Sequence, residues 1–251
     1  MSLNSIHRFS SRVDTYVRFR PSYPKKVIET LERECGLTHD SVIADIASGT
    51  GIFTKLLLEN GNRVFGVEPN AEMRRAGEEF LTGYPNFTSV NGTAEATTLA
   101  PDSVDFVTAA QAGHWFDRKK SRQEFVRILK KSGWAVLIWN ERKTASTPFL
   151  RDYEELLLRH GTDYKEVRHE HAVVGEFFDP RPFEERTFAL QQVFDYAGLE
   201  GRLMSSSYAP GPDHAGHVPM LRELRRIFER HQHGGQVVIE YATRMFYGRL
   251  A

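Results

Sequence analysis

The feature that most constrains this chain is an alternation of short apolar runs with amphipathic segments across residues 41–139. Apolar runs bounded by turns predict buried strands, and apolar residues spaced three or four apart predict helices between them. Strands buried on both faces are typical of parallel sheets. We therefore predict an α/β fold with a doubly wound, mostly parallel seven-stranded sheet and helices on both faces. The predicted strands are residues 41–46, 63–68, 87–90, 104–108, 134–139, 187–194 and 235–247.

The remaining segments are interpreted as parts of one domain that spans residues 1–251. Residues 1–22 are rich in Arg and aromatic side chains and are expected to form an N-terminal arm or lid. Residues 141–186 are polar, rich in His and interrupted by Pro180 and Pro182, so we expect a lid insertion there. Helices are predicted at 24–35, 53–58, 70–80, 121–131, 149–160 and 214–231.

Composition narrows the range of partners. Lys plus Arg and Asp plus Glu are 33 each, so the formal net charge is zero and nucleic acid is not an expected partner. The single cysteine, Cys35, allows no intrachain disulfide and fits a reducing compartment. No segment has the length or hydropathy of a signal peptide or membrane span, so we predict a cytoplasmic protein without a membrane partner. The sequence predicts nothing about oligomeric state.

A glycine-rich turn joins the first predicted strand to the next helix. Small residues there let a ligand approach the backbone, and the helix N-terminus offers free N–H groups. Glu68 ends the next predicted strand, where a carboxylate can accept both hydroxyls of a ribose. A dinucleotide-binding turn would need a third glycine at the position of Thr54, and Asp45 ahead of the turn suits a cationic ligand. These residues favour a nucleoside without a pyrophosphate.

The sequence Asp45-Ile46-Ala47-Ser48-Gly49-Thr50-Gly51 resembles the first motif of the class I S-adenosylmethionine-dependent methyltransferases, with Ala47 in place of the usual first glycine. Residues 66–70, 92–95 and 104–116 resemble further motifs of that Rossmann-like family. The resemblance implies S-adenosyl-L-methionine as the cofactor. The cofactor-binding residues that it implies are Asp45, Ala47, Ser48, Gly49, Thr50, Gly51, Glu68, Pro69, Asn70, Met73, Thr93, Ala94, Glu95, Gln111 and Ala112.

Residues 8–16, 20–24 and 205–208 resemble a subgroup similar to trans-aconitate methyltransferases and related small-molecule enzymes. The resemblance therefore implies methyl transfer to a small molecule, such as a carboxylate or another polar metabolite. Tyr16 is expected either to close over the cofactor, since an aromatic face attracts a sulfonium, or to lie on the surface. Candidates for the acceptor pocket are Arg20, Trp115, Phe116, Arg142 and Tyr208.

His114 follows the fourth predicted strand and is either a general base or a structural histidine. A base is needed only if the acceptor loses a proton, as an alcohol, phenol or thiol does. A carboxylate acceptor needs no base, and cationic side chains would then be expected to hold it. The pairs His169/His171 and His231/His233 lack a third ligand at helical spacing, so no metal site is predicted.

Three other functions remain as alternatives. A non-catalytic module, such as a sensor or partner subunit, would bind S-adenosylmethionine without transferring its methyl group. Thr54 disfavours a nicotinamide oxidoreductase, and the balanced charge disfavours a nucleic-acid methyltransferase.

Overall fold

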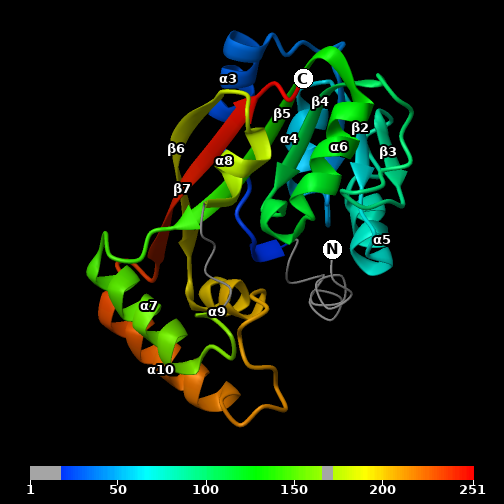
Figure 1. Cartoon of the computed structure of the whole chain (residues 1–251). Coiled ribbons are helices and arrows are strands. Elements are labelled where there is room, and N and C mark those ends of the chain that lie inside the picture. Colours follow the sequence, from blue (N-terminus) through cyan, green and yellow to red (C-terminus); the bar gives the residue numbers. More distant parts are fainter. Residues whose placement is uncertain (1–17, 166–171) are drawn as a thin grey trace.

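The computed structural model describes residues 18–165 and 172–251, which form a seven-stranded sheet in the order β3-β2-β1-β4-β5-β7-β6 (Figure 1). The strands β3, β2, β1, β4 and β5 pair in parallel, whereas β7 is antiparallel to β5 and β6. The predicted doubly wound, mostly parallel sheet is therefore confirmed. The strands are β1 (Val42–Ile46), β2 (Arg63–Val67), β3 (Phe87–Val90), β4 (Val104–Ala110), β5 (Leu129–Arg142), β6 (Phe183–Phe194) and β7 (Val237–Gly248).

Helices cover both faces of the sheet (Figure 1). One apolar core joins α3 and α4 to the sheet and includes Leu31 and Leu57. A second core lies on the other face, where Phe125 of α6 packs against Phe177 of α8. These helices are α3 (Lys26–Cys35), α4 (Ile52–Glu59), α5 (Ala71–Phe80), α6 (Arg118–Ile128) and α8 (Ala172–Phe178).

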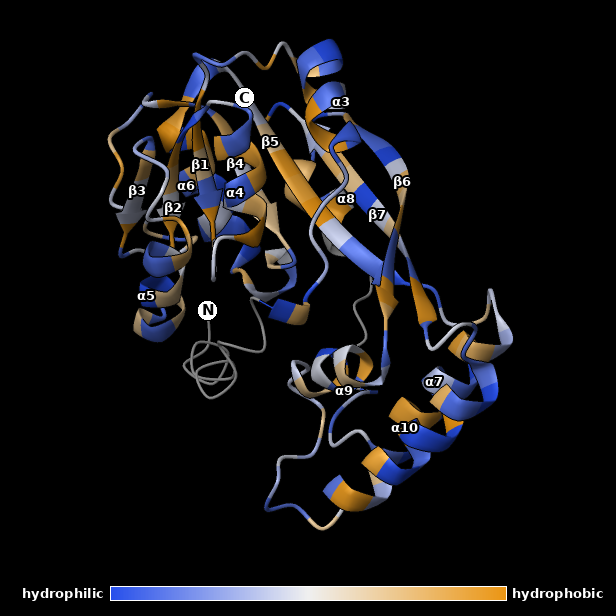
Figure 2. Cartoon of the chain, turned by 180° about the vertical axis from the view of Figure 1, so that it is seen from behind, coloured by the Kyte–Doolittle hydropathy of each residue, from blue (hydrophilic) through white to orange (hydrophobic). Residues whose placement is uncertain are grey.

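Three helices form a cap beyond the end of the sheet: α7 (Pro148–His160), α9 (Tyr196–Met204) and α10 (His217–His231). In Figure 2 the apolar sides of α7 and α10 are visible in this cap, and these side chains form a third core that extends to Tyr241 of β7. Polar contacts tie α7 to α10, and two of them involve histidines: His231 Nε2 lies 2.7 Å from Asp152, and His160 Nε2 lies 2.7 Å from Glu223.

The structure differs from the predicted elements around β5. The preceding helix stops at Ile128 instead of Lys131, because Leu129 already pairs with Val104 of β4. The strand then runs to Arg142, since β4 and β7 supply backbone partners on its two sides.

The predicted lid, residues 141–186, contributes α7 to the cap, but α8 packs against α6 on the sheet. The other cap helices, α9 and α10, come from residues beyond 186. No helix in the described ranges is long and apolar enough to cross a membrane.

Candidate functional site

The glycine-rich turn leaves β1 and enters α4 through three residues with a left-handed backbone: Ala47 (φ 54°), Gly49 (φ 58°) and Gly51 (φ 82°). Glycine adopts this conformation freely, whereas alanine pays about 1 kcal/mol for it. Ala47 therefore adopts a backbone conformation that favours glycine. The turn keeps its shape at a small energetic cost.

Helix α5 packs closely against this turn. A Cβ atom on Gly77 would lie 3.1 Å from the carbonyl oxygen of Gly49, and one on Gly51 would lie 2.6 Å from a methyl group of Leu81. The absence of side chains at these positions lets the turn and the helix pack in direct contact. The turn is thus held in one conformation by its surroundings.

Asp45 lies under the turn and is 1% exposed. Its carboxylate accepts hydrogen bonds from Thr54 Oγ1 at 2.6 Å and Thr108 Oγ1 at 2.9 Å. Burial raises the pKa of Asp45 to about 6, although the two hydroxyls act to lower it. Thr54, which occupies the third-glycine position of a dinucleotide motif, thus holds the acidic residue of the turn.

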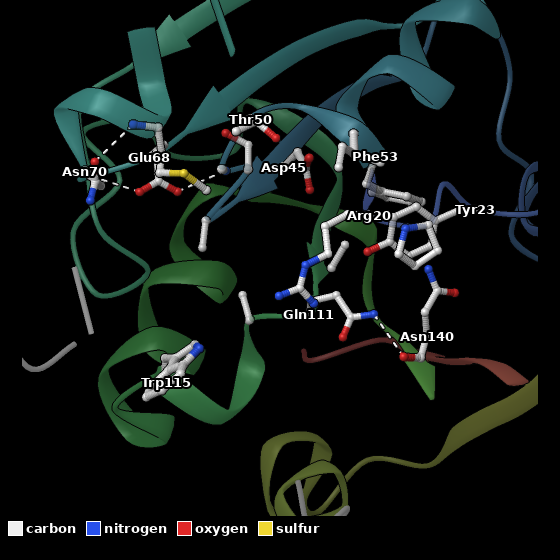
Figure 3. A pocket seen from close by; sticks show the side chains of 18 of the residues that line it. Arg20, Tyr23, Asp45, Thr50, Phe53, Glu68, Asn70, Gln111, Trp115 and Asn140 are labelled. Carbon is white, nitrogen blue, oxygen red and sulfur yellow. Dashed lines mark hydrogen bonds between the residues drawn. The ribbon is translucent and has the colours of Figure 1, made fainter. Parts of the chain in front are cut away.

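Glu68 follows β2 and connects the turn to α5 (Figure 3). Its carboxylate accepts from the backbone N–H of Gly49 at 2.9 Å and of Asn70 at 2.8 Å. Burial raises the pKa of Glu68, and these N–H groups partly oppose the rise. Asn70 caps α5 by accepting from the N–H groups of Glu72 and Met73. Each oxygen of Glu68 keeps a further lone pair for a ligand.

A pocket opens at the carboxyl ends of β1, β2 and β4, where ligands bind in open α/β sheets. Its empty space is about 1360 Å³, counting the open mouth. Most of the sequence-predicted residues share its wall. They are Arg20, Asp45, Ala47, Ser48, Gly49, Thr50, Glu68, Asn70, Met73, Gln111, Ala112, His114, Trp115 and Tyr208.

Several predicted residues lie outside the wall for identifiable reasons. Phe116 is 7% exposed because its ring packs edge-on against Phe125 in the core. Arg142 turns into the cap, where it pairs with Glu154 and donates to the hydroxyl of Tyr164 at 2.9 Å. Neither side chain, each predicted for the acceptor pocket, therefore lines this pocket.

The predicted cofactor-binding residues 93–95 also lie outside the wall. Ala94 is fully buried in the core, and Thr93 closes a small bridge with Ala96. Glu95 accepts a hydrogen bond from the N–H of Asp117 at 2.9 Å. Pro69 and Gly51 shape the neighbouring backbone and do not line the pocket, and Tyr16, His169 and His171 lie outside the described residues.

The mouth of the pocket is formed by the turn after β4. Gln111 has a left-handed backbone (φ 60°), and its side chain reaches the carbonyl oxygen of Asn140 at 3.5 Å. The rings of His114 and Trp115 lie with their centroids 4.6 Å apart. This arrangement places His114 in the wall and leaves its role as base or structural residue open.

Sequence reasoning missed part of the wall. Tyr23 and Phe53 form an edge-to-face pair at 4.9 Å on the side of α4, and Asn140 donates to the carbonyl of Ser22 at 3.0 Å. Arg202 of α9 is 6% exposed and lines the same pocket from the cap. An arginine on a short helix is expected at the surface from the sequence alone. The place of Arg202 in the pocket wall follows only from how the cap lies against the sheet.

Comparison with known proteins agrees with this geometry. Residues 44–137 match the family described as Methyltransferase domain. An uncharacterized methyltransferase of Mycobacterium tuberculosis is 35% identical over 153 residues, which are 61% of this chain and 60% of that protein. The chain thus spans about 60% of the length of the curated relatives it matches first.

Two solved structures share the fold. A proposed type II methyltransferase of Anaeromyxobacter dehalogenans superimposes with a TM-score of 0.71 at 22% identity, covering 92% of this chain and 98% of that one. A proposed methyltransferase from an antibiotic biosynthesis pathway of Anabaena variabilis gives 0.66 at 24% identity, covering 94% and 100%. Residues 44–137 are therefore similar to methyltransferase domains, and the chain shares the Rossmann-like fold of these two solved structures.

Proposed function

We propose that this protein transfers a methyl group from S-adenosyl-L-methionine to a small molecule that carries a carboxylate. The observation that supports this most is a division of charge within one pocket. Asp45 and Glu68 lie at the turn, and the guanidinium groups of Arg20 and Arg202 lie toward the cap. A cationic cofactor and an anionic acceptor would each meet opposite charge.

The turn fits the nucleoside cofactor. Thr50 is 1% exposed, and its hydroxyl has no hydrogen-bond partner among the described residues. A buried polar group without a partner is costly unless a ligand or water satisfies it. Glu68 retains lone pairs directed at the same region, and the left-handed turn brings the backbone of Gly49 to the wall.

S-adenosylmethionine supplies an electrophilic methyl group on its sulfonium. The protein's task is to orient the acceptor and to keep water away from it. Arg20 and Arg202 are suited to hold a carboxylate by charge-assisted hydrogen bonds. A carboxylate is already deprotonated at neutral pH, so this reaction needs no general base. We therefore assign His114 to the pocket wall, beside Trp115.

Cofactor binding is tested by isothermal titration calorimetry with S-adenosylmethionine and S-adenosylhomocysteine. We expect Glu68→Gln to weaken binding at least about tenfold, because a buried acceptor of ribose hydroxyls loses its charge. Glu72→Gln is the matched control, since Glu72 is exposed in the first turn of α5, which follows Glu68. Absence of binding to the unaltered protein would overturn the proposal. Binding without formation of S-adenosylhomocysteine from any carboxylate would favour the non-catalytic module.

A further inference from the structure

The guanidinium of Arg202 is buried where α9 meets the pocket, and hydroxyl groups hold only part of it. Arg202 is 6% exposed, and it donates from Nε to the hydroxyl of Tyr241 at 3.1 Å and from Nη1 to Ser206 Oγ at 3.1 Å. Within the described residues, no carboxylate pairs with Arg202, and its Nη2 has no hydrogen-bond acceptor. A buried cation held in this way is incompletely compensated. Because Arg202 lines the pocket, the N–H groups of Nη2 can serve an anionic ligand there.

The hydroxyl of Tyr241 links Arg202 to Gln192. Tyr241 is 1% exposed on β7, and its hydroxyl donates to Gln192 Oε1 at 2.8 Å. Gln192 belongs to β6, and its Nε2 donates to the backbone carbonyl of Phe19 at 3.2 Å. A chain of hydrogen bonds thus runs from Arg202 through two side chains to the segment before α3.

The two ends of this chain fix the direction of every hydrogen bond in it. A guanidinium can only donate, and a carbonyl can only accept. The Tyr241 oxygen accepts from Arg202, so its single proton goes to Gln192. The amide of Gln192 then serves both neighbours in one orientation only, with its oxygen toward Tyr241 and its nitrogen toward Phe19. A carboxylate at position 192 would have no proton for the carbonyl of Phe19, so the chain requires an amide there.

The second arginine of the pocket is attached to the same chain. Arg20 follows Phe19 directly, lines the pocket (Figure 3) and donates from Nη2 to the carbonyl of Ser205 at 2.9 Å. Ser205 Oγ in turn donates to the carbonyl of Arg202 at 2.7 Å. The ring of Phe19 lies directly against α9, since a Cβ atom on Gly201 would overlap it. Hydrogen bonds and backbone therefore form a closed loop that contains both arginines.

We propose that Gln192 is a positioning residue for the acceptor site. It orients Arg202 through Tyr241, and its other hydrogen bond anchors the segment that carries Arg20. This inference rests on the proposed function. Gln192 does not line the pocket, so it acts only through these neighbours. Guanidinium groups that are fixed before the ligand arrives lose less side-chain entropy when they bind it. Loss of Gln192 should therefore weaken binding of a carboxylate and leave cofactor binding intact.

The first test needs no acceptor. The Nε–H signals of the arginines are recorded by heteronuclear NMR, and the signal of Arg202 is assigned by its loss in Arg202→Lys. In the unaltered protein we expect this group to exchange with solvent far more slowly than that of Arg222, which is exposed. Gln192→Met removes the amide but nearly keeps the length of the side chain, so it should shift the Arg202 signal and speed its exchange.

Gln191→Met is the matched control for this measurement. Gln191 is exposed on the opposite face of β6 and should leave the Arg202 signal where it is. An unchanged Arg202 signal in Gln192→Met would overturn the proposal. Exchange of Arg202 in the unaltered protein as fast as that of Arg222 would also overturn it.

The second test measures acceptor binding. Succinate is titrated calorimetrically into protein saturated with S-adenosylhomocysteine, with succinamide as the neutral control. We expect Gln192→Met to weaken succinate binding roughly tenfold, because a poorly oriented guanidinium loses part of a charge-assisted hydrogen bond. Its affinity for S-adenosylhomocysteine should be unchanged, and Gln191→Met should bind both ligands like the unaltered protein.

A second background distinguishes positioning from a merely structural role. Lysine lacks the Nε–H group that Tyr241 accepts, so Arg202→Lys already removes the group that Gln192 orients. Gln192→Met should therefore weaken succinate binding much less in Arg202→Lys than in the unaltered protein. Equal weakening in both backgrounds would mean that Gln192 acts independently of Arg202, and the proposal would be wrong.

The outcomes separate this inference from the proposed function. Succinate binding that is equally strong in Gln192→Met overturns the role of Gln192 alone. Binding of S-adenosylhomocysteine without binding of succinate overturns the carboxylate site and this inference with it. Exchange of the Arg202 Nε–H group in the unaltered protein can be measured even if Gln192→Met fails to fold.

Discussion

Replacement of Asp45 by asparagine should stabilise the fold while it weakens cofactor binding. Burial raises the pKa of Asp45 from 3.8 to about 6 in the folded protein. The unfolded chain ionises near the ordinary value, so a charged Asp45 costs the folded state roughly 3 kcal/mol at neutral pH. This cost is absent below about pH 4, where Asp45 is protonated in both states, and it is complete once the pH has risen above about 6.

Asparagine removes the charge but not the need for hydrogen bonds. Thr54 and Thr108 both donate to the carboxylate, and the amide of asparagine offers one acceptor oxygen and one donor nitrogen. One hydroxyl must therefore turn, which offsets about 1 kcal/mol of the gain. We expect a net stabilisation of about 1–2 kcal/mol at neutral pH, or roughly 2–8 °C in Tm for a domain of this size.

Thermal unfolding of the unaltered protein and Asp45→Asn at about pH 8, 6 and 4 measures this effect. The gain in Tm should be largest at the highest pH, and at the lowest pH, where Asp45 is protonated, only the hydrogen-bond cost of about 1 kcal/mol should remain. Asp40→Asn, at an exposed position, is the control and should show no such trend. A lower Tm for Asp45→Asn at about pH 8, or a difference independent of pH, would refute the reasoning.

Two further predictions concern the turn and helix α6. Gly51→Ala should lower the free energy of unfolding by about 2–4 kcal/mol, because residue 51 has a left-handed backbone and a Cβ atom there would meet Leu81. Urea titrations measure this loss. A loss below about 1 kcal/mol would contradict the close packing of the turn. Hydrogen bonds from Arg127 and Thr97 lower the pKa of Glu124 to about 2. The ionised Glu124 stabilises the fold above about pH 4.5, and this stabilisation is lost as the pH falls toward 2. After allowance for solvent screening, Glu124→Gln should therefore lower the free energy of unfolding by about 1–2 kcal/mol at neutral pH and leave it unchanged near pH 2. A loss of stability that does not depend on pH would count against this ion pair.

The parallel part of the sheet could be predicted because β1, β2 and β4 are short and mostly apolar, and because a turn with Gly49 and Gly51 marks the first crossover. The same pattern placed Glu68 beside that turn, since neighbouring parallel strands end at one edge. The length of β5 could not be predicted, because Leu129 and Trp134 pair with β4 on either side of an irregularity that contains the polar residues between them.

The side of the pocket nearer the cap was harder to predict from the sequence. Arg142 and Arg202 look alike in the sequence, but packing directs Arg142 to Glu154 and Arg202 to the pocket. Phe116 follows Trp115 in the chain, yet its side chain enters the core. Such choices depend on how the cap meets the sheet, and only contacts distant in sequence determine them.

The most direct test of the central claim is transfer of a deuterated methyl group from S-adenosylmethionine to a panel of small carboxylates, followed by mass spectrometry. The account predicts a labelled methyl ester of at least one carboxylate. It also predicts that the product disappears in Arg202→Gln while S-adenosylhomocysteine still binds that variant. Labelled product on an amine or nucleic acid, or no labelled ester from a protein that binds the cofactor, would contradict it.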